Sequence, residues 1–204
     1  MGLNLIGESL VGQISSSLGN LTFLNTLDLG NNSFRGPIPL LNRLQNLNKL
    51  SLWGNLLEGV IPVGLTNCSN LVGLDLSENN LVGYIPSNIG FLTKLKIIFL
   101  YSNYLTGVIP LTLGKISTLE EVDLSDNQLN GSIPNEVWQM PNIVEFILGQ
   151  NNLSSGIPDT LSNLSSLMVL SLTTNMLGSA LPSNIGDALP NLQYLYLAQN
   201  SFVC

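Results

Sequence analysis

The sequence predicts an α/β repeat solenoid, in which one small structural unit is copied along the whole chain. Three observations lead to this prediction: evenly spaced asparagines, alternating leucines before each asparagine, and a glycine and a proline after it. The asparagines are Asn32, Asn55, Asn79, Asn103, Asn127, Asn151, Asn175 and Asn200. Their intervals are 23, 24, 24, 24, 24, 24 and 25 residues. Such a period is the signature of a repeat architecture, because each copy buries its apolar side chains against its neighbours.

The leucines before each asparagine predict a short strand. In one copy, Leu74 and Leu76 alternate with polar residues just before Asn79. A period of two residues is typical of a strand with one buried face. Stacked copies pair these strands into a parallel sheet with a spacing of about 4.8 Å.

The residues after the strand predict a turn and a return segment. The amide group of Asn79 can donate to backbone carbonyls and accept from amides of neighbouring turns, so a column of asparagines satisfies backbone groups that no strand reaches. Gly83 supplies a permissive backbone, and Pro86 stops helix propagation. Ile89 and Leu92 then line an irregular or 3₁₀ segment.

The second half of the unit occurs with little change in five copies. These are Phe34/Gly36/Ile38/Pro39, Leu57/Gly59/Ile61/Pro62, Leu81/Gly83/Ile85/Pro86, Leu105/Gly107/Ile109/Pro110 and Leu129/Gly131/Ile133/Pro134. The complete unit, LxxLxLxxNxLxGxIPxxLxxLxx, resembles the plant-type leucine-rich repeat of 24 residues over nearly the whole chain. The resemblance implies a leucine-rich-repeat superhelix with a concave parallel β-sheet, convex 3₁₀ or irregular segments, and a second short strand in each copy.

Three longer phrases resemble a narrower group. They are the segments LGNLTFL at 18–24, LTNCSNL at 65–71 and LPSNIGDALPNL at 181–192. These phrases are similar to ectodomains of cereal leucine-rich-repeat receptor kinases, in the group that contains rice bacterial immune receptors.

Some copies depart from the unit. The first copy has Glu8 in place of the asparagine and Ser15 in place of the proline, so we expect an irregular N-terminal end. Ser155 and Ser179 stand where glycine is expected, and we expect locally distorted turns there.

We expect one solenoid of about eight repeats over residues 1–204, because each repeat contacts only its neighbours. Residues 1–23 form an irregular first repeat, 24–191 seven full repeats and 192–204 a truncated last repeat. Family ectodomains usually have cysteine-paired caps, which this chain lacks. We therefore expect a segment of a longer receptor-like protein, whose uncapped ends can associate with other copies.

The composition and the length of the apolar segments indicate where the protein is located. Apolar residues make up 45% and charged residues 9%, which suits a continuous leucine core. No segment reaches 18 consecutive apolar residues, so we expect no membrane insertion, and no signal peptide is visible. The resemblance implies an extracellular or plasma-membrane location as part of a longer protein.

The two cysteines, Cys68 and Cys204, are predicted not to form a disulfide. About five and a half repeats separate them, which is roughly 26 Å at the strand spacing. A disulfide requires α-carbons within about 7 Å. Cys68 replaces a core leucine and is expected to be a small buried hydrophobe.

Sequons for N-glycosylation indicate a glycoprotein that lives outside the cell. They occur at Asn20, Asn31, Asn67, Asn130, Asn152 and Asn163. An asparagine-rich repeat also generates sequons by chance. A glycan on Asn31 would obstruct part of the concave surface.

Catalysis is not expected. The chain has no histidine, which removes the commonest general base, Ser-His-Asp triads and most zinc sites. The glycines are repeat turns rather than a phosphate loop. We predict no enzyme activity, no cofactor and no metal. A net charge of −7 also argues against nucleic acid as a partner.

Strand residues that alternate with the leucines point away from the core, and they are the candidate ligand-binding residues. Large apolar and acidic side chains gather among them, as is typical of protein interfaces. We predict that the binding face comprises Trp53, Asp75, Glu78, Ile97, Phe99, Tyr101, Glu121, Asp123, Asp126, Glu145, Tyr194 and Tyr196. An acidic field favours a basic partner. Cross-strand aromatics can also simply stabilise a sheet, and acids can simply maintain solubility.

Three functions remain open. The first is the ligand-binding segment of a plant receptor kinase or receptor-like protein, which the resemblance implies senses a protein, peptide or microbial molecule in innate immunity, or binds a co-receptor ectodomain. The second is a defence protein like the polygalacturonase inhibitors, which would bind a secreted hydrolase. The third is a structural or assembly fragment without a ligand of its own.

Overall fold

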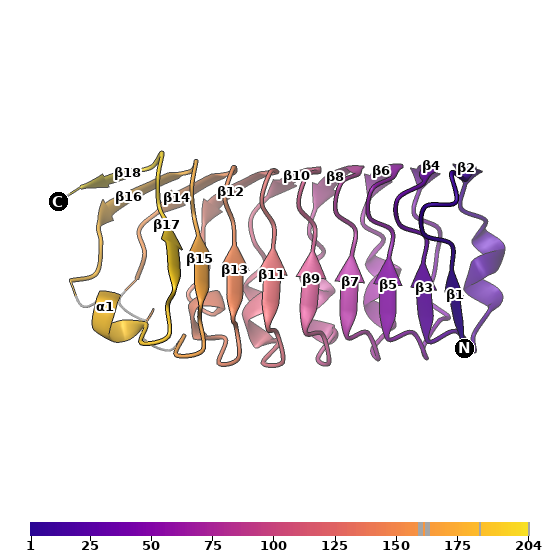
Figure 1. Cartoon of the computed structure of the whole chain (residues 1–204), viewed down its shortest axis with the longest axis horizontal. Helices are drawn as coiled ribbons and strands as arrows, with labels where there is room; N and C mark the ends of the chain where they lie inside the picture. Colours follow the sequence, from indigo (N-terminus) through magenta and orange to yellow (C-terminus); the bar gives the residue numbers. More distant parts are fainter. Residues whose placement is uncertain (159–160, 162–163, 184, 204) are drawn as a thin grey trace.

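The computed structural model of the chain describes residues 1–158, 161, 164–183 and 185–203. They form a curved solenoid in which successive turns add strands to two parallel sheets (Figure 1). The first sheet contains β1 (Gly2–Asn4), β3 (Thr26–Asp28), β5 (Lys49–Ser51), β7 (Gly73–Asp75), β9 (Ile97–Phe99), β11 (Glu121–Asp123), β13 (Glu145–Ile147), β15 (Val169–Ser171) and β17 (Tyr194–Tyr196). The predicted parallel-sheet solenoid is confirmed.

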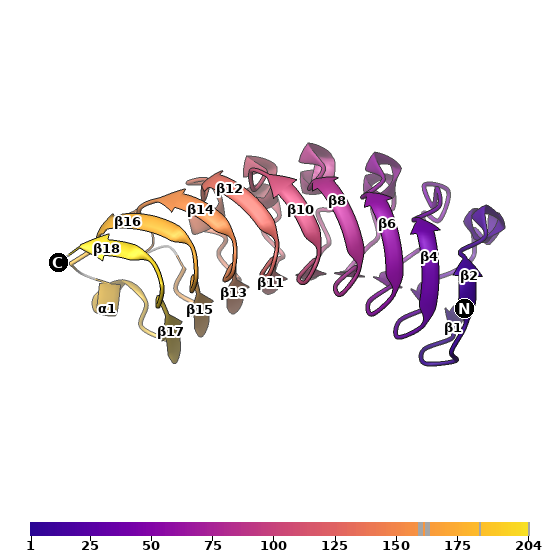
Figure 2. The same ribbon diagram turned by 90° about the horizontal axis from the view of Figure 1, so that it is seen from above.

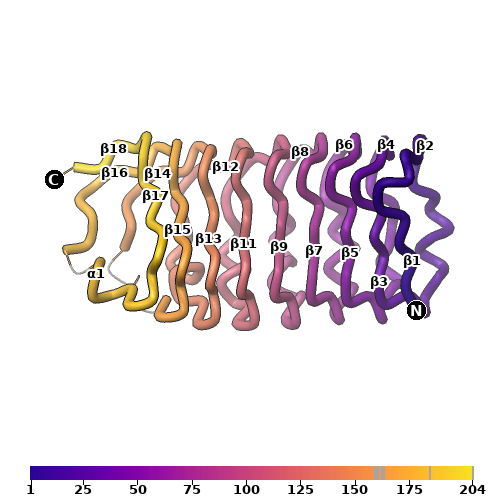
Figure 3. Tube along the Cα trace, viewed as in Figure 1, coloured from indigo at the N-terminus to yellow at the C-terminus, as the bar shows by residue number. Residues whose placement is uncertain are grey.

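The second half of each repeat adds the second sheet. Its strands are β2 (Val11–Gln13), β4 (Ser33–Pro37), β6 (Leu56–Val60), β8 (Asn80–Tyr84), β10 (Tyr104–Gly107), β12 (Gln128–Ser132), β14 (Asn152–Ser155), β16 (Met176–Ala180) and β18 (Ser201–Val203). This sheet bears out the second strand that the repeat type implies. The two sheets run side by side along the solenoid (Figure 3).

Short helical turns connect the second sheet back to the first. They are η1 (Ser16–Asn20), η2 (Val63–Asn67), η3 (Ser87–Phe91), η4 (Leu111–Lys115), η5 (Val137–Gln139) and the four-residue helix α1 (Ile185–Ala188). Figure 2 shows the 3₁₀ turns on the outer side of the arc and the first sheet on its inner side. The first sheet is therefore the concave face.

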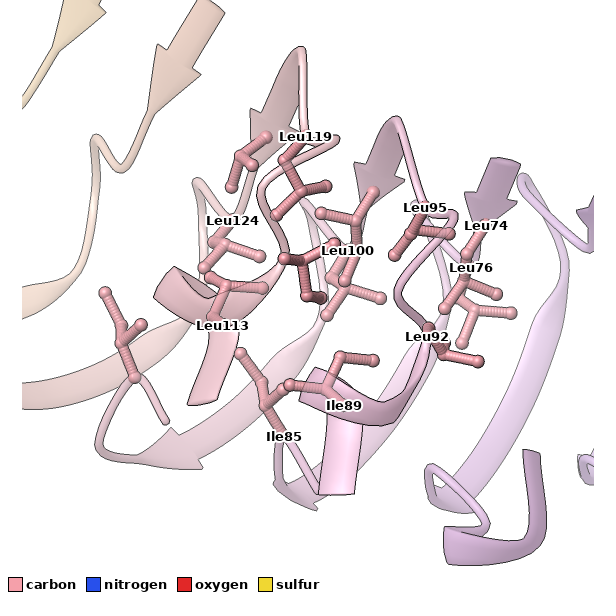
Figure 4. Packing of buried hydrophobic residues seen from close by; sticks show 14 of the residues in the cluster. Leu74, Leu76, Ile85, Ile89, Leu92, Leu95, Leu100, Leu113, Leu119 and Leu124 are labelled. Carbon is pink, nitrogen blue, oxygen red and sulfur yellow. The ribbon is translucent and has the colours of Figure 1, made fainter. Parts of the chain in front are cut away.

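The leucine core fills the space between the sheets and the helical turns. Leu74 of β7 and Leu76 just after it pack with Ile89, Leu92 and Leu95 of the return segment, and none of these side chains is more than 2% exposed (Figure 4). A fully buried leucine contributes about 1.5–3 kcal/mol relative to an exposed one. The repeated apolar positions therefore make one continuous core along the arc.

The asparagine column bonds each repeat to the one before it. The Nδ2 of Asn103 donates to the carbonyls of Leu100, Tyr101 and Leu76, over 3.1, 3.2 and 3.0 Å. Its Oδ1 accepts from the amide of Leu81 at 3.0 Å. Leu76 and Leu81 belong to the preceding repeat, so one side chain satisfies backbone groups of two repeats. The same pattern recurs at the other asparagines of the column.

The first repeat differs from the others mainly in its turn. It forms β1, β2 and η1, and Ser15 caps η1 by accepting a hydrogen bond from the amide of Ser17 at 3.2 Å. Glu8 provides no asparagine amide, and both Gly7 and Ser9 have positive φ.

The turns at Ser155 and Ser179 keep the geometry of the glycine turns, so the expectation of distortion is wrong. Their φ angles are 75° and 72°. The glycines of this column have φ between 75° and 80°: Gly36, Gly59, Gly83, Gly107 and Gly131. Strand pairing with the neighbouring repeats holds the backbone of β14 in place. Each serine therefore adopts a left-handed conformation that is costly for a residue with a Cβ.

Cys68 is a buried thiol of the core, as predicted. Its Sγ donates to the carbonyl of Leu41 at 3.3 Å. Burial raises the pKa of the thiol to about 11, which keeps it protonated and unreactive at neutral pH. Cys204, and with it the predicted absence of a bridge, lies outside the described residues.

Replacing a column asparagine should strongly destabilise the solenoid. In Asn103→Ala, the amide of Leu81 and three carbonyls lose a buried partner, so we expect a loss of about 3 kcal/mol in the free energy of unfolding. Urea unfolding followed by circular dichroism measures the change. Asn135→Ala removes an exposed asparagine and is the matched control. Equal losses in both variants would contradict the role assigned to the column.

Replacing Ser155 by glycine should stabilise the protein. The left-handed backbone costs a serine about 1–2 kcal/mol, and glycine avoids this cost. Glycine also makes the unfolded chain more flexible, which offsets part of the gain in stability. We expect Ser155→Gly to raise the free energy of unfolding by about 0.5–1 kcal/mol. The control is Ser154→Gly, on a neighbouring residue without positive φ, which should lower it. A loss of stability in Ser155→Gly would show that the turn carries no strain.

Candidate ligand-binding face

The concave sheet presents the predicted binding residues to solvent. Outward positions of its strands alternate with buried leucines, and the predicted side chains are all exposed or half-buried. Strand pairing aligns equivalent positions across repeats, so that Gly73, Ile97, Glu121 and Glu145 form one row across the sheet. The face is therefore a grid whose rows are set by the repeat.

The aromatic part of the face lies at the C-terminal end of β9 and just beyond it. The rings of Phe99 and Tyr101 are tilted by 56° with centroids 6.3 Å apart. Ile97 extends the same strand, and the Tyr101 hydroxyl donates to Oε1 of Glu78 at 3.3 Å. Ile97 and Phe99 lie in β9, Tyr101 lies two residues after it, and all three side chains are half-buried. They make an apolar ridge in the middle of the concave face.

The two strands that flank the ridge carry aspartates with a local structural role. An oxygen of Asp75 accepts from the hydroxyl and the amide of Ser77, at 2.6 and 3.1 Å. Asp123 makes the same contacts with Ser125, at 2.6 and 2.9 Å. Burial raises the pKa of both carboxyls, although these hydrogen bonds oppose the shift. Both aspartates therefore brace the ends of their strands as well as facing solvent.

A cluster of glutamates adjoins the ridge on its C-terminal side. Glu121 and Glu145 are directly opposed on β11 and β13. Burial, followed by repulsion from Glu145 and Glu120, raises the pKa of Glu121. Lys96 forms an ion pair with Glu120 at 2.6 Å. A cation from a partner would relieve the repulsion between the two opposed glutamates.

Glu78 and Asp126 occupy the turn just before the column asparagine. Both have left-handed backbones, with φ of 52° and 51°. The Asp126 Oδ2 accepts from the hydroxyl of Ser102 at 2.9 Å. The two side chains therefore lie at the rim of the concave sheet.

The remaining predicted residues do not join the β9 ridge. A side chain at Gly30 would collide with the indole of Trp53, so this ring leans over the end of β3 and away from β9. Tyr194 and Tyr196 stack with centroids 6.2 Å apart and planes 5° from parallel. They lie on β17, with three strands between them and β9. The predicted aromatic residues therefore lie in three separate parts of the concave face.

A hollow on the concave face was missed by the sequence reasoning. Gly73 lacks a side chain beside Ile97 and Phe99, and leaves a groove of about 580 Å³. Its lining is Asn48, Lys49, Leu50, Val72, Gly73, Leu74, Asp75, Lys96, Ile97 and Phe99. The signal was present, because Gly73 stands between Lys49 and Ile97, two larger residues of the same row.

A second hollow, of about 630 Å³, lies between the second sheet and the helical turns. Its exposed apolar residues are Val60, Val63, Tyr84, Val108 and Leu111. The signal was the apolar residue between the glycine and the isoleucine of the repeat, which is Val60, Tyr84 or Val108 in three successive copies.

The sequons occupy several surfaces. Those with exposed asparagines are Asn20, Asn31, Asn67, Asn130 and Asn152, while Asn163 lies outside the described residues. Asn31 has a left-handed backbone at the rim of the concave sheet.

Within the part of the chain that the structure describes, no three His, Cys, Asp or Glu side chains gather as metal ligands do. In the same residues, no helix has both the length and the apolar character that a membrane crossing requires.

Comparison with known proteins identifies the repeat. A family model described as Leucine rich repeat matches residues 45–105, and a second model of that description matches residues 23–44 and 118–140. Receptor-like protein EIX1 of Solanum lycopersicum is 44% identical over 75 residues, which are 36% of this chain and 7% of that protein. The LRR receptor-like serine/threonine-protein kinase GSO2 of Arabidopsis thaliana is 45% identical over 73 residues, which are 35% of this chain and 6% of the kinase. The matched segments therefore span less than a tenth of these receptors.

Solved structures agree over nearly the whole chain. The Arabidopsis receptor kinase HAESA, in complex with the peptide hormone IDA and the co-receptor SERK1, superposes with a TM-score of 0.94 and 39% identity. That match covers 98% of this chain and 34% of HAESA. The plant peptide hormone receptor RGFR1, in complex with RGF2, gives a TM-score of 0.91 and 36% identity, covering 95% of this chain and 35% of that one.

Neutralising Glu121 should stabilise the protein at neutral pH. A raised carboxyl pKa means that the charged form is disfavoured in the folded state, so its cost is present above that pKa and disappears as the pH falls towards the ordinary value of 4.5. The side chain is largely solvated, so we expect Glu121→Gln to gain only about 0.5 kcal/mol at pH 7, and less at pH 4.

Urea unfolding at both pH values measures this gain. Glu58→Gln, on the second sheet, is the control because it removes a carboxylate away from Glu121 and Glu145. If Glu121→Gln stabilised the protein more at pH 4 than at pH 7, charge repulsion at Glu121 could not be the cause.

Proposed function

Because the chain belongs to the leucine-rich-repeat family of plant receptor-like ectodomains, we propose that it is a ligand-binding segment of a receptor kinase or receptor-like protein. Its concave face binds a basic peptide or protein. The chain itself performs no catalysis, and any signalling step belongs to other parts of a longer protein.

One observation carries the proposal: the apolar ridge on β9 lies between acidic strands at the centre of the concave sheet. Ile97, Phe99 and Tyr101 offer apolar area, while Glu78 and Glu121 flank them with negative charge. Aromatic anchors within a polar surround are the usual composition of binding hot spots. The apolar side chains of this ridge face solvent, so the core of the solenoid does not require them.

Charge favours a basic ligand. The chain has a net charge of −7. Among the described residues, the ion pairs are Lys49–Asp28 and Lys96–Glu120, so both concave-face lysines are already matched. A basic partner therefore gains attraction and also relieves the repulsion between Glu121 and Glu145.

Related receptors support a peptide or co-receptor as the partner. HAESA is bound to a peptide hormone and a co-receptor, and RGFR1 is bound to RGF2. We propose an extracellular location at the plasma membrane and glycans at the exposed sequons. Membership of the cereal immune-receptor group, and a role in innate immunity, stay predictions.

Truncating the ridge should weaken binding. We expect Tyr101→Ala to reduce the affinity for a basic peptide about tenfold or more, because a central aromatic anchor contributes at least 1–2 kcal/mol. The probe is the tightest peptide selected from a displayed library of random dodecapeptides, with binding measured by calorimetry. Tyr84→Ala removes an exposed tyrosine of the second sheet and should leave the affinity unchanged.

Two results would count against the proposal. Failure to select any peptide on the folded chain would remove the peptide-binding function. Tight binding of a basic secreted pectin hydrolase, with inhibition and no selected peptide, would favour the alternative of a defence inhibitor.

A further inference from the structure

The groove at Gly73 lies on the concave face between β5 and β9. Lys49, Gly73 and Ile97 are directly paired across β5, β7 and β9. The glycine leaves the space between the two flanking side chains empty, and Leu50 and Leu74 are among the residues that line it. Most of the lining surface is apolar, and Phe99 closes one side.

The backbone does not require glycine at this position. A Cβ on Gly73 would meet only Cγ of Lys49, at 3.9 Å, which is ordinary contact. Its φ is not positive, unlike that of Gly83 and Gly107 at 79° and 77°. Strands also favour larger side chains over glycine. The structural effect of Gly73 is therefore to keep the hollow open.

Charge identifies the ligand that fits the hollow. The row that contains Gly73 and Ile97 continues to Glu121 and Glu145. Neither of these two glutamates takes part in the ion pairs described for residues 1–158, and they face each other across β11 and β13. A ligand with an apolar group at Gly73 therefore meets negative charge two strands further along.

We propose that the Gly73 hollow takes one apolar side chain of an extended peptide whose next basic residue faces Glu121 and Glu145. This inference rests on the proposed peptide-binding function and specifies its anchor. Two strand spacings of about 4.8 Å separate Gly73 from Glu121, and an extended peptide advances about 3.3 Å per residue. The basic side chain thus lies about three residues from the apolar anchor.

Peptide selection tests the spacing. Random dodecapeptides displayed on phage are selected on the folded chain, and the tightest binder is synthesised as the probe. The expected binders carry a leucine, isoleucine, methionine or phenylalanine about three residues from an arginine or lysine. Binders without this pair of residues would overturn the proposal.

Filling the hollow tests the anchor. We expect Gly73→Leu to weaken the probe about tenfold to a hundredfold, because the bound apolar side chain loses its burial. Val169→Leu enlarges a residue of the same row on β15 and is the matched control, with no change expected. Thermal unfolding confirms that both variants fold.

Neutralising Glu121 tests the predicted contact with the basic residue of the peptide. Glu121→Gln should weaken the probe severalfold, and a probe with its basic residue replaced by glutamine should bind wild type and variant equally. Unchanged binding to Gly73→Leu, together with weaker binding to Tyr101→Ala, would overturn the anchor and leave the concave-face function standing. Failure to select any peptide would overturn both.

Discussion

The solenoid depends on one interaction, the hydrogen bonding of the column asparagines between adjacent repeats. Each side chain donates to carbonyls of its own turn and of the preceding repeat, and accepts from an amide of that repeat. The carbonyls follow the strands of the first sheet, and the Leu81 amide lies in β8 of the second sheet. An unpaired buried backbone group is costly, so the amide holds neighbouring turns at a single separation and register.

A fixed register makes the concave face a set of aligned rows, and the function follows from what each row contains. The β9 ridge, the glutamates of β11 and β13, and the hollow at Gly73 are contiguous only because equivalent positions pair across the sheet. Variation within a row therefore changes the surface without changing the fold. This separation lets one scaffold present different binding chemistry.

Stability and binding overlap at several positions. Asp75 and Asp123 face solvent on the binding side, yet each also braces its strand through a serine two residues later. Glu78 and Asp126 sit in left-handed turns that the column geometry imposes. An acidic residue on this face is thus not evidence of ligand contact by itself, and the β9 ridge and the glutamate pair are the features that favour binding.

The amino-acid sequence by itself determined the repeat, the parallel sheet, the asparagine column and the outward-facing rows, because these depend on local period and on residue type. It also indicated which side chains lie on the concave face. Only the tertiary structure decided which of them meet: Trp53 leans over the strand before it, and the tyrosines of β17 lie far from β9. It also decided that Ser155 and Ser179 adopt the glycine turn, and that Gly73 leaves an open groove. The physical reason is that side-chain direction, turn geometry and empty space depend on packing between neighbouring repeats, which a pattern along one chain does not contain.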